Sequence, residues 1–442
     1  MTARLRKLLD NLAESFWLLP AGIVLAGALI ALALVQTDRS GLLPRWLLED
    51  WLYDGGATGA RTLLGAVASS TIGVAGTVFS ITIASLSLAA GQMGPRLLRN
   101  FTRDRGNQFT LGAFLGTFSY ALIVLRSVRT QDEGAFVPHL SLTIAIVLAF
   151  VCVATLVYFV GHMAGRINVD TVIELVSDEV QSTIVRLTTD KPQAAPPPDD
   201  FWRNGTSVDD ARQGYLLHID DQGLADWASE HKTSIRMLVR PGQYVFPGAP
   251  IAVIVPAVEE AAAAIRSATA LGQQRVSSAD LEFAVRQLVE VAVRALSPGI
   301  NDPHTAMSVL DRLGAALCQI VPLYLPTGVV MRDGHPALVV PSTRYEGLLN
   351  VMFHMIRQSA SANAAVLIRM LDVLTAVVSA ERDDARMLFL KVHADLVAGD
   401  ARRNVSTPAD LQDIERRHAA FLTTLRHGPL GALHPLDDAR TI

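Results

Sequence analysis

Serine and threonine residues are concentrated in one uncharged stretch of the chain. No Asp, Glu, Lys or Arg occurs from residue 62 to residue 95, and one membrane crossing needs only about 20 residues. Between residues 69 and 87 its hydroxyl side chains are Ser69, Ser70, Thr71, Thr77, Ser80, Thr82, Ser85 and Ser87. Such groups can line a path for ions or small solutes without a fixed charge. They can also bond across packed helices or to carbonyls of their own helix.

Two interpretations of this stretch therefore stay open. The functional one is a pore in a homo-oligomer, narrowed by Phe79 or Ile83 and lined by one helical stripe: Ser69, Gly73, Thr77, Ser80, Ala84 and Ser87. The structural one is close packing, because small residues let membrane helices approach each other. Close packing is also the ordinary meaning of the GxxxG pair Gly112 and Gly116 in a later apolar run.

Three arginines follow the uncharged stretch. Gly94 and Pro95 interrupt the run, and Arg96, Arg99 and Arg103 then recur on one face of a continuing helix. Their charges suit adhesion to an anionic lipid leaflet, at about 1 kcal/mol per basic residue. The alternative is a cationic ring at the mouth of a pore, which would favour anions. Adhesion to lipid headgroups is the favoured interpretation.

Outside the apolar runs, one string suggests a binding site: RALSPGINDPHT at 294–305. Its favoured interpretation is structural, since Asp302 would cap a helix that begins with Pro303. Free amides at a helix N-terminus also attract anions. The anion-binding candidates are Arg294, Asn301, Asp302 and His304.

The sequence offers no catalytic constellation. It has no HExxH, Walker lysine, GxSxG or metal-spaced His and Cys set. The cysteines, Cys152 and Cys318, lie too far apart in the sequence for a CxxC centre. We therefore expect no enzyme activity, no catalytic residue, no metal and no cofactor. An enzyme acting on lipid headgroups has little support without a recognisable catalytic pair.

The composition indicates a membrane protein. Of 442 residues, 50% are hydrophobic and only 18% are charged, against about 25% charged in soluble domains. Transmembrane helices are predicted near 16–36, 65–91, 107–128 and 139–163, the first as an uncleaved anchor. Basic residues precede the first span and follow the second, which predicts that both termini lie in the cytoplasm. The outer segment 44–53, rich in Trp and Leu, predicts an interfacial helix.

The predicted fold class is a four-helix transmembrane domain followed by a cytoplasmic α+β, mainly helical domain. Predicted regions are a transmembrane domain (1–165), a connecting helix and Pro-rich linker (166–212), an α+β region (213–342), a helical region (343–428) and a flexible tail (429–442). Strands are expected at 215–219, 234–239 and 251–255, with a hairpin joining 329–331 to 337–340. Helices are expected at 223–231, 279–296, 303–320, 344–359, 363–380, 383–398 and 407–426.

Two further features limit the function of this soluble part. The chain has a net charge of −4, and its acidic excess lies after residue 165, which disfavours nucleic-acid binding. The string RPGQYVFPGAP at 240–250 is similar to the hairpins of lipoyl- and biotinyl-type domains. No lysine lies at its tip, so we expect a β unit without a prosthetic group.

Several strings together resemble one bacterial family. They are SFWLLP at 15–20, GVAGTVFSITIASLSLAAGQMGPRLLRNFTRDRGNQ at 73–108, FVPHLS at 136–141 and RALSPGINDPHTA at 294–306. They resemble the predicted membrane proteins grouped as domain of unknown function 2254, and the resemblance covers nearly the entire chain. It implies a polytopic membrane protein with a cytoplasmic C-terminal region and brings no activity with it.

These features lead to one functional hypothesis and one alternative. Acidic residues lie outside the predicted spans, which favours passive conduction over coupled transport. We expect a bacterial inner-membrane channel or pore that is a homo-oligomer, lined by the second span and regulated by its cytoplasmic domain. Its partners would be the lipid bilayer, other copies of the chain and an ion or small solute. The alternative is a membrane-anchored sensory or scaffold protein whose cytoplasmic domain binds a small anion or a protein partner.

Overall fold

The computed structural model describes residues 16–40, 56–93, 104–129, 136–166, 168–273 and 281–429. The chain forms two compact units, Met1–Thr171 and Val172–Ile442, and each is described by itself. Some predictions fall outside the described residues. These are the interfacial helix at 44–53, the arginines Arg96, Arg99 and Arg103, and the tail beyond residue 429.

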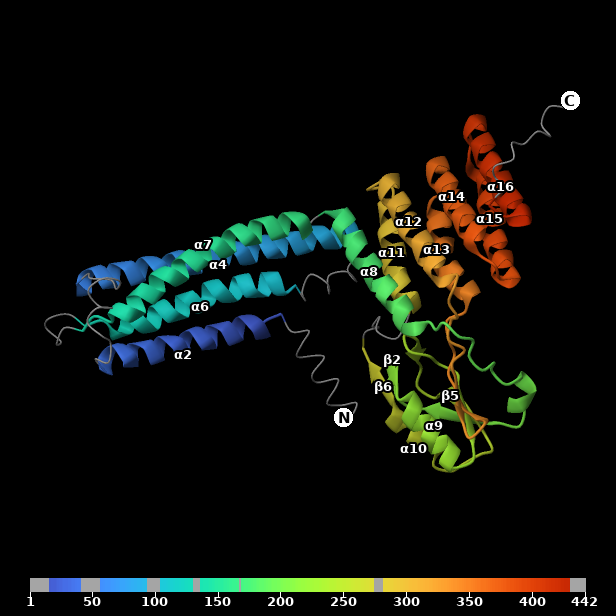
Figure 1. The fold of residues 1–442 in the computed structure, drawn as a ribbon, viewed down its shortest axis with the longest axis horizontal. Helices are drawn as coiled ribbons and strands as arrows, with labels where there is room; N and C mark the ends of the chain where they lie inside the picture. Colours follow the sequence, from blue (N-terminus) through green and yellow to red (C-terminus); the bar gives the residue numbers. More distant parts are fainter. Residues whose placement is uncertain are drawn as a thin grey trace. The chain divides into compact units, whose positions relative to one another are not determined.

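The first unit contains four long apolar helices that lie side by side (Figure 1). They are α2 (Leu18–Ser40), α4 (Ala57–Met93), α6 (Arg105–Ser127) and α7 (His139–Arg166). All four are long and apolar enough to cross a membrane, as predicted. Helix α4 is unbroken over 37 residues, or about 55 Å at 1.5 Å per residue. It begins well before the predicted span because its hydrogen bonding continues through residues too polar for a hydrocarbon core.

Helix α6 is the central helix of this four-helix bundle. It packs against α2, α4 and α7, and the bundle itself buries half of its most apolar window. Glycines allow the approach of α2 and α6. A β-carbon on Gly27 would lie 2.7 Å from the Gly116 carbonyl oxygen, and one on Gly112 would lie 2.5 Å from the Ile23 side chain. The predicted packing role of the GxxxG pair is confirmed.

The second unit opens with helix α8 (Val169–Leu187) and a mixed α/β region. A five-stranded sheet has the order β1-β5-β3-β8-β7, and a three-stranded sheet has the order β4-β2-β6. Only the β3–β8 pair is parallel among the described strand pairs. The strands are β1 (Thr206–Asp210), β2 (Gly214–Ile219), β3 (Ser234–Met237), β4 (Tyr244–Val245), β5 (Ala249–Val255), β6 (Thr269–Gly272), β7 (Val329–Arg332) and β8 (His335–Val339).

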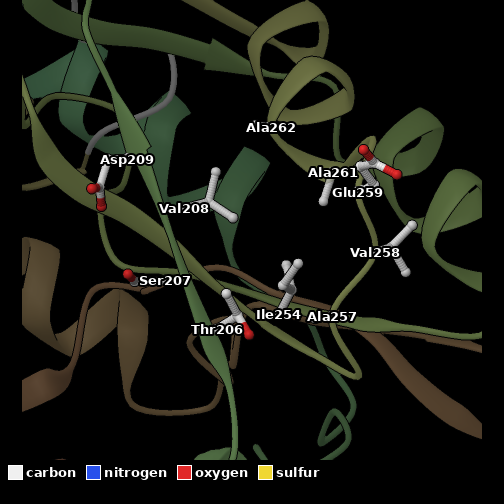
Figure 2. Close-up of a pocket in the computed structure, with 10 residues that line it drawn as sticks. All are labelled: Thr206, Ser207, Val208, Asp209, Ile254, Ala257, Val258, Glu259, Ala261 and Ala262. Carbon is white, nitrogen blue, oxygen red and sulfur yellow. The ribbon is translucent and has the colours of Figure 1, made fainter.

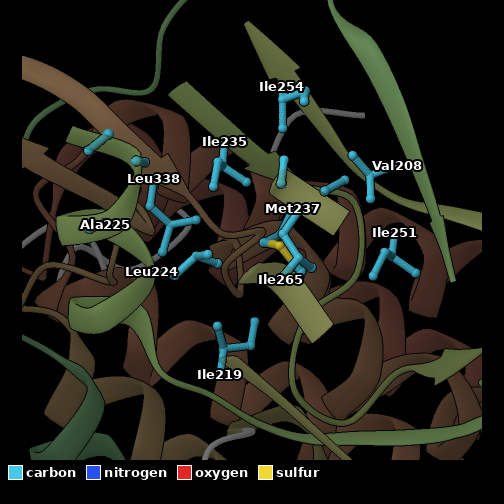
Figure 3. Packing of buried hydrophobic residues seen from close by; sticks show 14 of the residues in the cluster. Val208, Ile219, Leu224, Ala225, Ile235, Met237, Ile251, Ile254, Ile265 and Leu338 are labelled. Carbon is cyan, nitrogen blue, oxygen red and sulfur yellow. The ribbon is translucent and has the colours of Figure 1, made fainter. Parts of the chain in front are cut away.

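Two short helices, α9 (Asp221–Glu230) and α10 (Ala261–Ala268), cover these strands. Between them lies a compact apolar core (Figure 3). Ile235, Met237 and Leu338 from the five-stranded sheet meet Leu224 of α9 and Ile265 of α10. The segment 243–246, between Pro241-Gly242 and Pro247-Gly248, contains a short strand. It supplies β4 to the smaller sheet, while its flanking strands β3 and β5 pair with each other.

The rest of the second unit is helical, as predicted. Its helices are α11 (Leu281–Ala295), α12 (Pro303–Ile320), α13 (Tyr345–Ser359), α14 (Ala364–Ala380), α15 (Asp384–Asn404) and α16 (Pro408–His427). Helix α14 packs against α12, α15 and α16. Its apolar stripe from Leu367 to Val378 is buried, so α14 is a core helix of this helical region.

Candidate functional site

The predicted pore stripe lies on the face of α4 that the bundle leaves open. The bundle buries the opposite face, which includes Leu64, Ala68, Thr71, Ala75, Val78, Thr82 and Ser85. The stripe residues Ser69, Gly73, Thr77, Ser80, Ala84 and Ser87 are all exposed in the single chain. At 100° per residue the two sets point in opposite directions. Hydroxyls therefore lie on both faces, but only one face contacts the described helices.

Large apolar side chains flank the stripe. Ile72, Phe79 and Ile83 lie on one side and Ile81 and Leu88 on the other, each 41–51% exposed. Phe79 and Ile83, the residues expected to narrow the pore, therefore lie beside the stripe. Along the stripe, the described part of the chain places no atom within 4 Å of a β-carbon built on Gly73. The result is a shallow small-residue strip between two apolar ridges.

The hydroxyls of the stripe bond to their own helix. Thr77 Oγ1 donates to the Gly73 carbonyl at 3.2 Å, and Ser80 Oγ donates to the Gly76 carbonyl at 2.9 Å. Ser69 Oγ donates to Ala66 in the same way. In these three residues the hydroxyl proton is used, and each oxygen keeps a lone pair that can accept a further hydrogen bond. The strip can thus accept hydrogen bonds from water or solvate a cation.

Polar contacts join α7 to α2 at one end of the bundle and to the N-terminus of α6 at the other. At one end the Asp38 carboxylate accepts hydrogen bonds from the Leu140 and Ser141 amides and, at 2.6 Å, from Ser141 Oγ. At the other end Asp104 caps α6 and lies 2.6 Å from His162 Nε2 of α7. The pairing of His162 with Asp104 was not predicted. The available signal was an aspartate directly before a helix.

The loop at 297–302 forms the expected helix cap. Asp302 accepts hydrogen bonds from the Thr305 amide at 3.2 Å and the Thr305 hydroxyl at 2.6 Å, and the hydroxyl bond lowers the pKa of Asp302. Asn301, at φ 50°, and His304 are exposed, and Arg294 is half-buried. A carboxylate thus already occupies the helix N-terminus where an anion would bind, which favours the capping role.

A buried polar cluster in the second unit was not predicted. Asp400 of α15 bonds to Arg357 of α13 and to Arg403. His354 and His393 lie beside this pair, with ring centroids 5.1 Å apart. Within the described part of the chain, His354 Nδ1, Arg357 Nε and His393 Nδ1 have no hydrogen-bond partner and almost no solvent access. Unsatisfied buried groups cost about 1–3 kcal/mol each.

Burial disfavours the protonated form of these two histidines. It lowers the pKa of His393 to about 4, with smaller effects from His354 and Arg357. It also lowers the pKa of His354, again with a contribution from Arg357. Sequence patterns do not bring the two histidines together, because they come from two different helices, α13 and α15.

The remaining surface features offer little chemistry. An open depression lies where β1, β5 and the start of α10 meet (Figure 2). Its lining includes Thr206, Ser207, Asp209 and Glu259, with no histidine or basic side chain among the lining residues. Among the described residues, no group of three or more His, Cys, Asp or Glu is placed to hold a metal ion.

Four helices of membrane-crossing length, joined to a mixed unit of sheets and helices, define the class as a predicted polytopic membrane protein. The chain belongs to the family described as predicted membrane protein DUF2254, whose model matches residues 13–376. It is 30% identical over 429 residues to uncharacterized proteins of Mycobacterium tuberculosis (strains H37Rv and CDC 1551) and Mycobacterium bovis. These alignments cover 93% of this chain and 80% of each relative. No solved structure matches the chain.

Proposed function

We propose that the protein is a homo-oligomeric passive channel of the bacterial inner membrane. Copies of α4 line the pore, and the second unit, cytoplasmic like both termini, regulates it. One observation carries the proposal: the hydroxyl strip of α4 is exposed along its length, directly opposite the face that packs in the bundle. Acyl chains cannot donate hydrogen bonds to a strip of oxygen acceptors. Water or ions around a symmetry axis could interact with these oxygens.

The ridges beside the strip fit this arrangement. In a ring of α4 helices, Ile72, Phe79 and Ile83 of one copy would meet Ile81 and Leu88 of the next. Such contacts would close the wall of the pore while the strip faces its axis. Because the hydroxyl protons bond to backbone carbonyls, the remaining lone pairs would favour cations or neutral solutes that donate hydrogen bonds.

Substituted-cysteine accessibility tests the water-facing strip. We expect a charged methanethiosulfonate reagent to modify Thr77→Cys and Ser80→Cys in membranes, because reaction needs a thiolate in contact with water. The background is Cys318→Ser, since Cys318 is exposed and Cys152 is buried. The matched control is Val157→Cys on α7, whose side chain is 71% exposed and would face lipid. Equal protection of Thr77→Cys and Val157→Cys would contradict the channel.

Conduction itself is tested with protein reconstituted in planar bilayers in symmetric KCl. We expect currents that Ser80→Leu or Thr77→Leu reduces at least several-fold, because a bulky apolar side chain narrows and dries the strip. Val157→Leu should leave the currents unchanged. A monomeric native state, measured by mass photometry in detergent or nanodiscs, would exclude the proposed ring.

The second candidate function is a membrane-anchored sensory protein. The observation that favours it is the group of buried, unpartnered nitrogens between α13 and α15. Two results together would favour this function over the channel. The second unit would bind a small anion, and the protein would show neither current nor reagent access to α4.

A further inference from the structure

Three buried side-chain nitrogen atoms of the second unit belong to one cluster and have no hydrogen-bond partner among the described residues. His354 and Arg357 are one turn apart on α13, and His393 lies on α15 against the His354 ring, at 5.1 Å between centroids. His393 is 2% exposed and Arg357 is 8% exposed. The Phe353 ring also lies against the His393 ring, at 5.7 Å between centroids. The cluster is therefore largely buried among packed helices, with His354 at its partly exposed edge.

The neighbouring carboxylate cannot satisfy these nitrogens. One oxygen of Asp400 bonds to Arg357 Nη1 and the other to Arg403 Nη2. Both carboxylate oxygens thus accept hydrogen bonds from terminal guanidinium nitrogens. Arg357 Nε has no hydrogen-bond partner among the described residues. An arginine Nε can only donate, so the missing group must be an acceptor.

The electrostatics favour an anion over a metal ion. Arg357 and Arg403 carry two positive charges against the single negative charge of Asp400, and Arg357 lowers the pKa of both histidines. The potential at the rings is therefore positive, which repels a divalent cation that two imidazoles could otherwise bind. A water molecule would satisfy the same atoms by accepting from Arg357 Nε and by accepting from or donating to each ring, according to the ring's tautomer.

We propose that the second unit binds one small anion of chloride size between α13 and α15, held by Arg357 Nε, His354 Nδ1 and His393 Nδ1. Each neutral ring donates through its Nδ1–H tautomer, and the anion completes the charge balance of the arginine pair. This site is separate from the loop at 301–304, where Asp302 occupies the helix N-terminus. It does not depend on whether α4 lines a pore.

The test is thermal unfolding of the full chain in detergent, at constant ionic strength, with sodium chloride replacing sodium gluconate. Gluconate is a much larger anion than chloride and serves as the reference salt. A ligand that binds only the folded state raises the unfolding midpoint with its concentration, so we expect a rise of several degrees that saturates. Line broadening of the ³⁵Cl resonance by the protein gives a second, direct readout of binding.

The variants His354→Leu and His393→Leu should lose both signals, because each removes one donor. His304→Leu, in the exposed loop, is the matched control and should keep both. His354 is only partly buried, so His354→Leu remains informative if His393→Leu does not fold. Equal midpoints in chloride and gluconate without line broadening would show that only water fills the site. Signals that survive in His354→Leu, or vanish in His304→Leu, would equally overturn the proposal.

Discussion

At the scale of single residues, burial of a histidine ring favours its neutral form over its protonated form. His393 is the clearest case, because its ring is almost completely buried and burial lowers its pKa to about 4. In an unfolded chain the pKa of histidine is about 6.5. The folded state therefore resists a proton that the unfolded state accepts readily, and stability becomes linked to pH.

We expect the second unit to lose stability as the pH falls from about 6.5 to about 4. Above this window both states are neutral at His393, and within it only the unfolded state gains the proton. The shift corresponds to about 3 kcal/mol at most, and His354 adds to it in the same direction. The measurement is denaturant unfolding in chloride-free buffer, with hydrogen exchange of α13 and α15 as local readout.

The variant His393→Leu should flatten this pH dependence, because leucine cannot take up the proton. The exposed His304→Leu serves as the control and should follow the unchanged protein. A slope that persists undiminished in His393→Leu would assign the acid sensitivity to other groups.

At the scale of elements, glycine placement decides which helices touch. On α2, Gly27 meets the backbone of Gly116 on α6, whereas the structure describes no atom within 4 Å of a β-carbon built on Gly22. The same substitution on one helix should thus have opposite effects at these two positions.

We expect Gly27→Ala to destabilise the bundle by about 1–3 kcal/mol, because the added methyl group collides with a backbone carbonyl that cannot move alone. Gly22→Ala should be neutral or slightly stabilising, since alanine has the higher helix propensity. Thermal unfolding of the detergent-solubilised protein compares the two. Equal midpoints would mean that α2 and α6 are not in this contact.

Elements with local signals could be predicted from the sequence. Helices α12, α13, α14 and α16 begin and end within a residue of expectation, because amphipathic spacing and caps such as Asp302 lie within the segment. The strand β1 and the helix α10 were missed. In β1 only Val208 and Asp210 are buried, so its sequence shows no clear apolar alternation, and its pairing with β5 is long-range.

The same division holds for the candidate sites. The α4 stripe follows from helical periodicity alone, but which of its two hydroxyl faces the bundle covers depends on packing against α6 and α7. The His354, Arg357 and His393 cluster needs the contact of α13 with α15. Periodicity within either helix predicts the face on which each residue lies. It does not predict which other helix packs against that face.

At the scale of the whole molecule, the two units have separate apolar interiors. We expect residues 168–429 to fold without the first unit, since a unit with its own core can fold alone. The expressed fragment should be soluble and helical by circular dichroism, with one cooperative thermal transition. A fragment that stays molten or precipitates would show that the four-helix bundle completes its core.

The length of α4 has a consequence for the proposed insertion. Its 37 residues make a rod of about 55 Å, nearly twice a hydrocarbon layer of about 30 Å. Uncharged from Thr62 to its end at Met93, the rod has no ionised group along that length to fix its depth. The set of hydroxyls that lies within acyl chains is then decided by lipid tail length, so bilayers built from shorter or longer lipids would immerse different turns of the same helix.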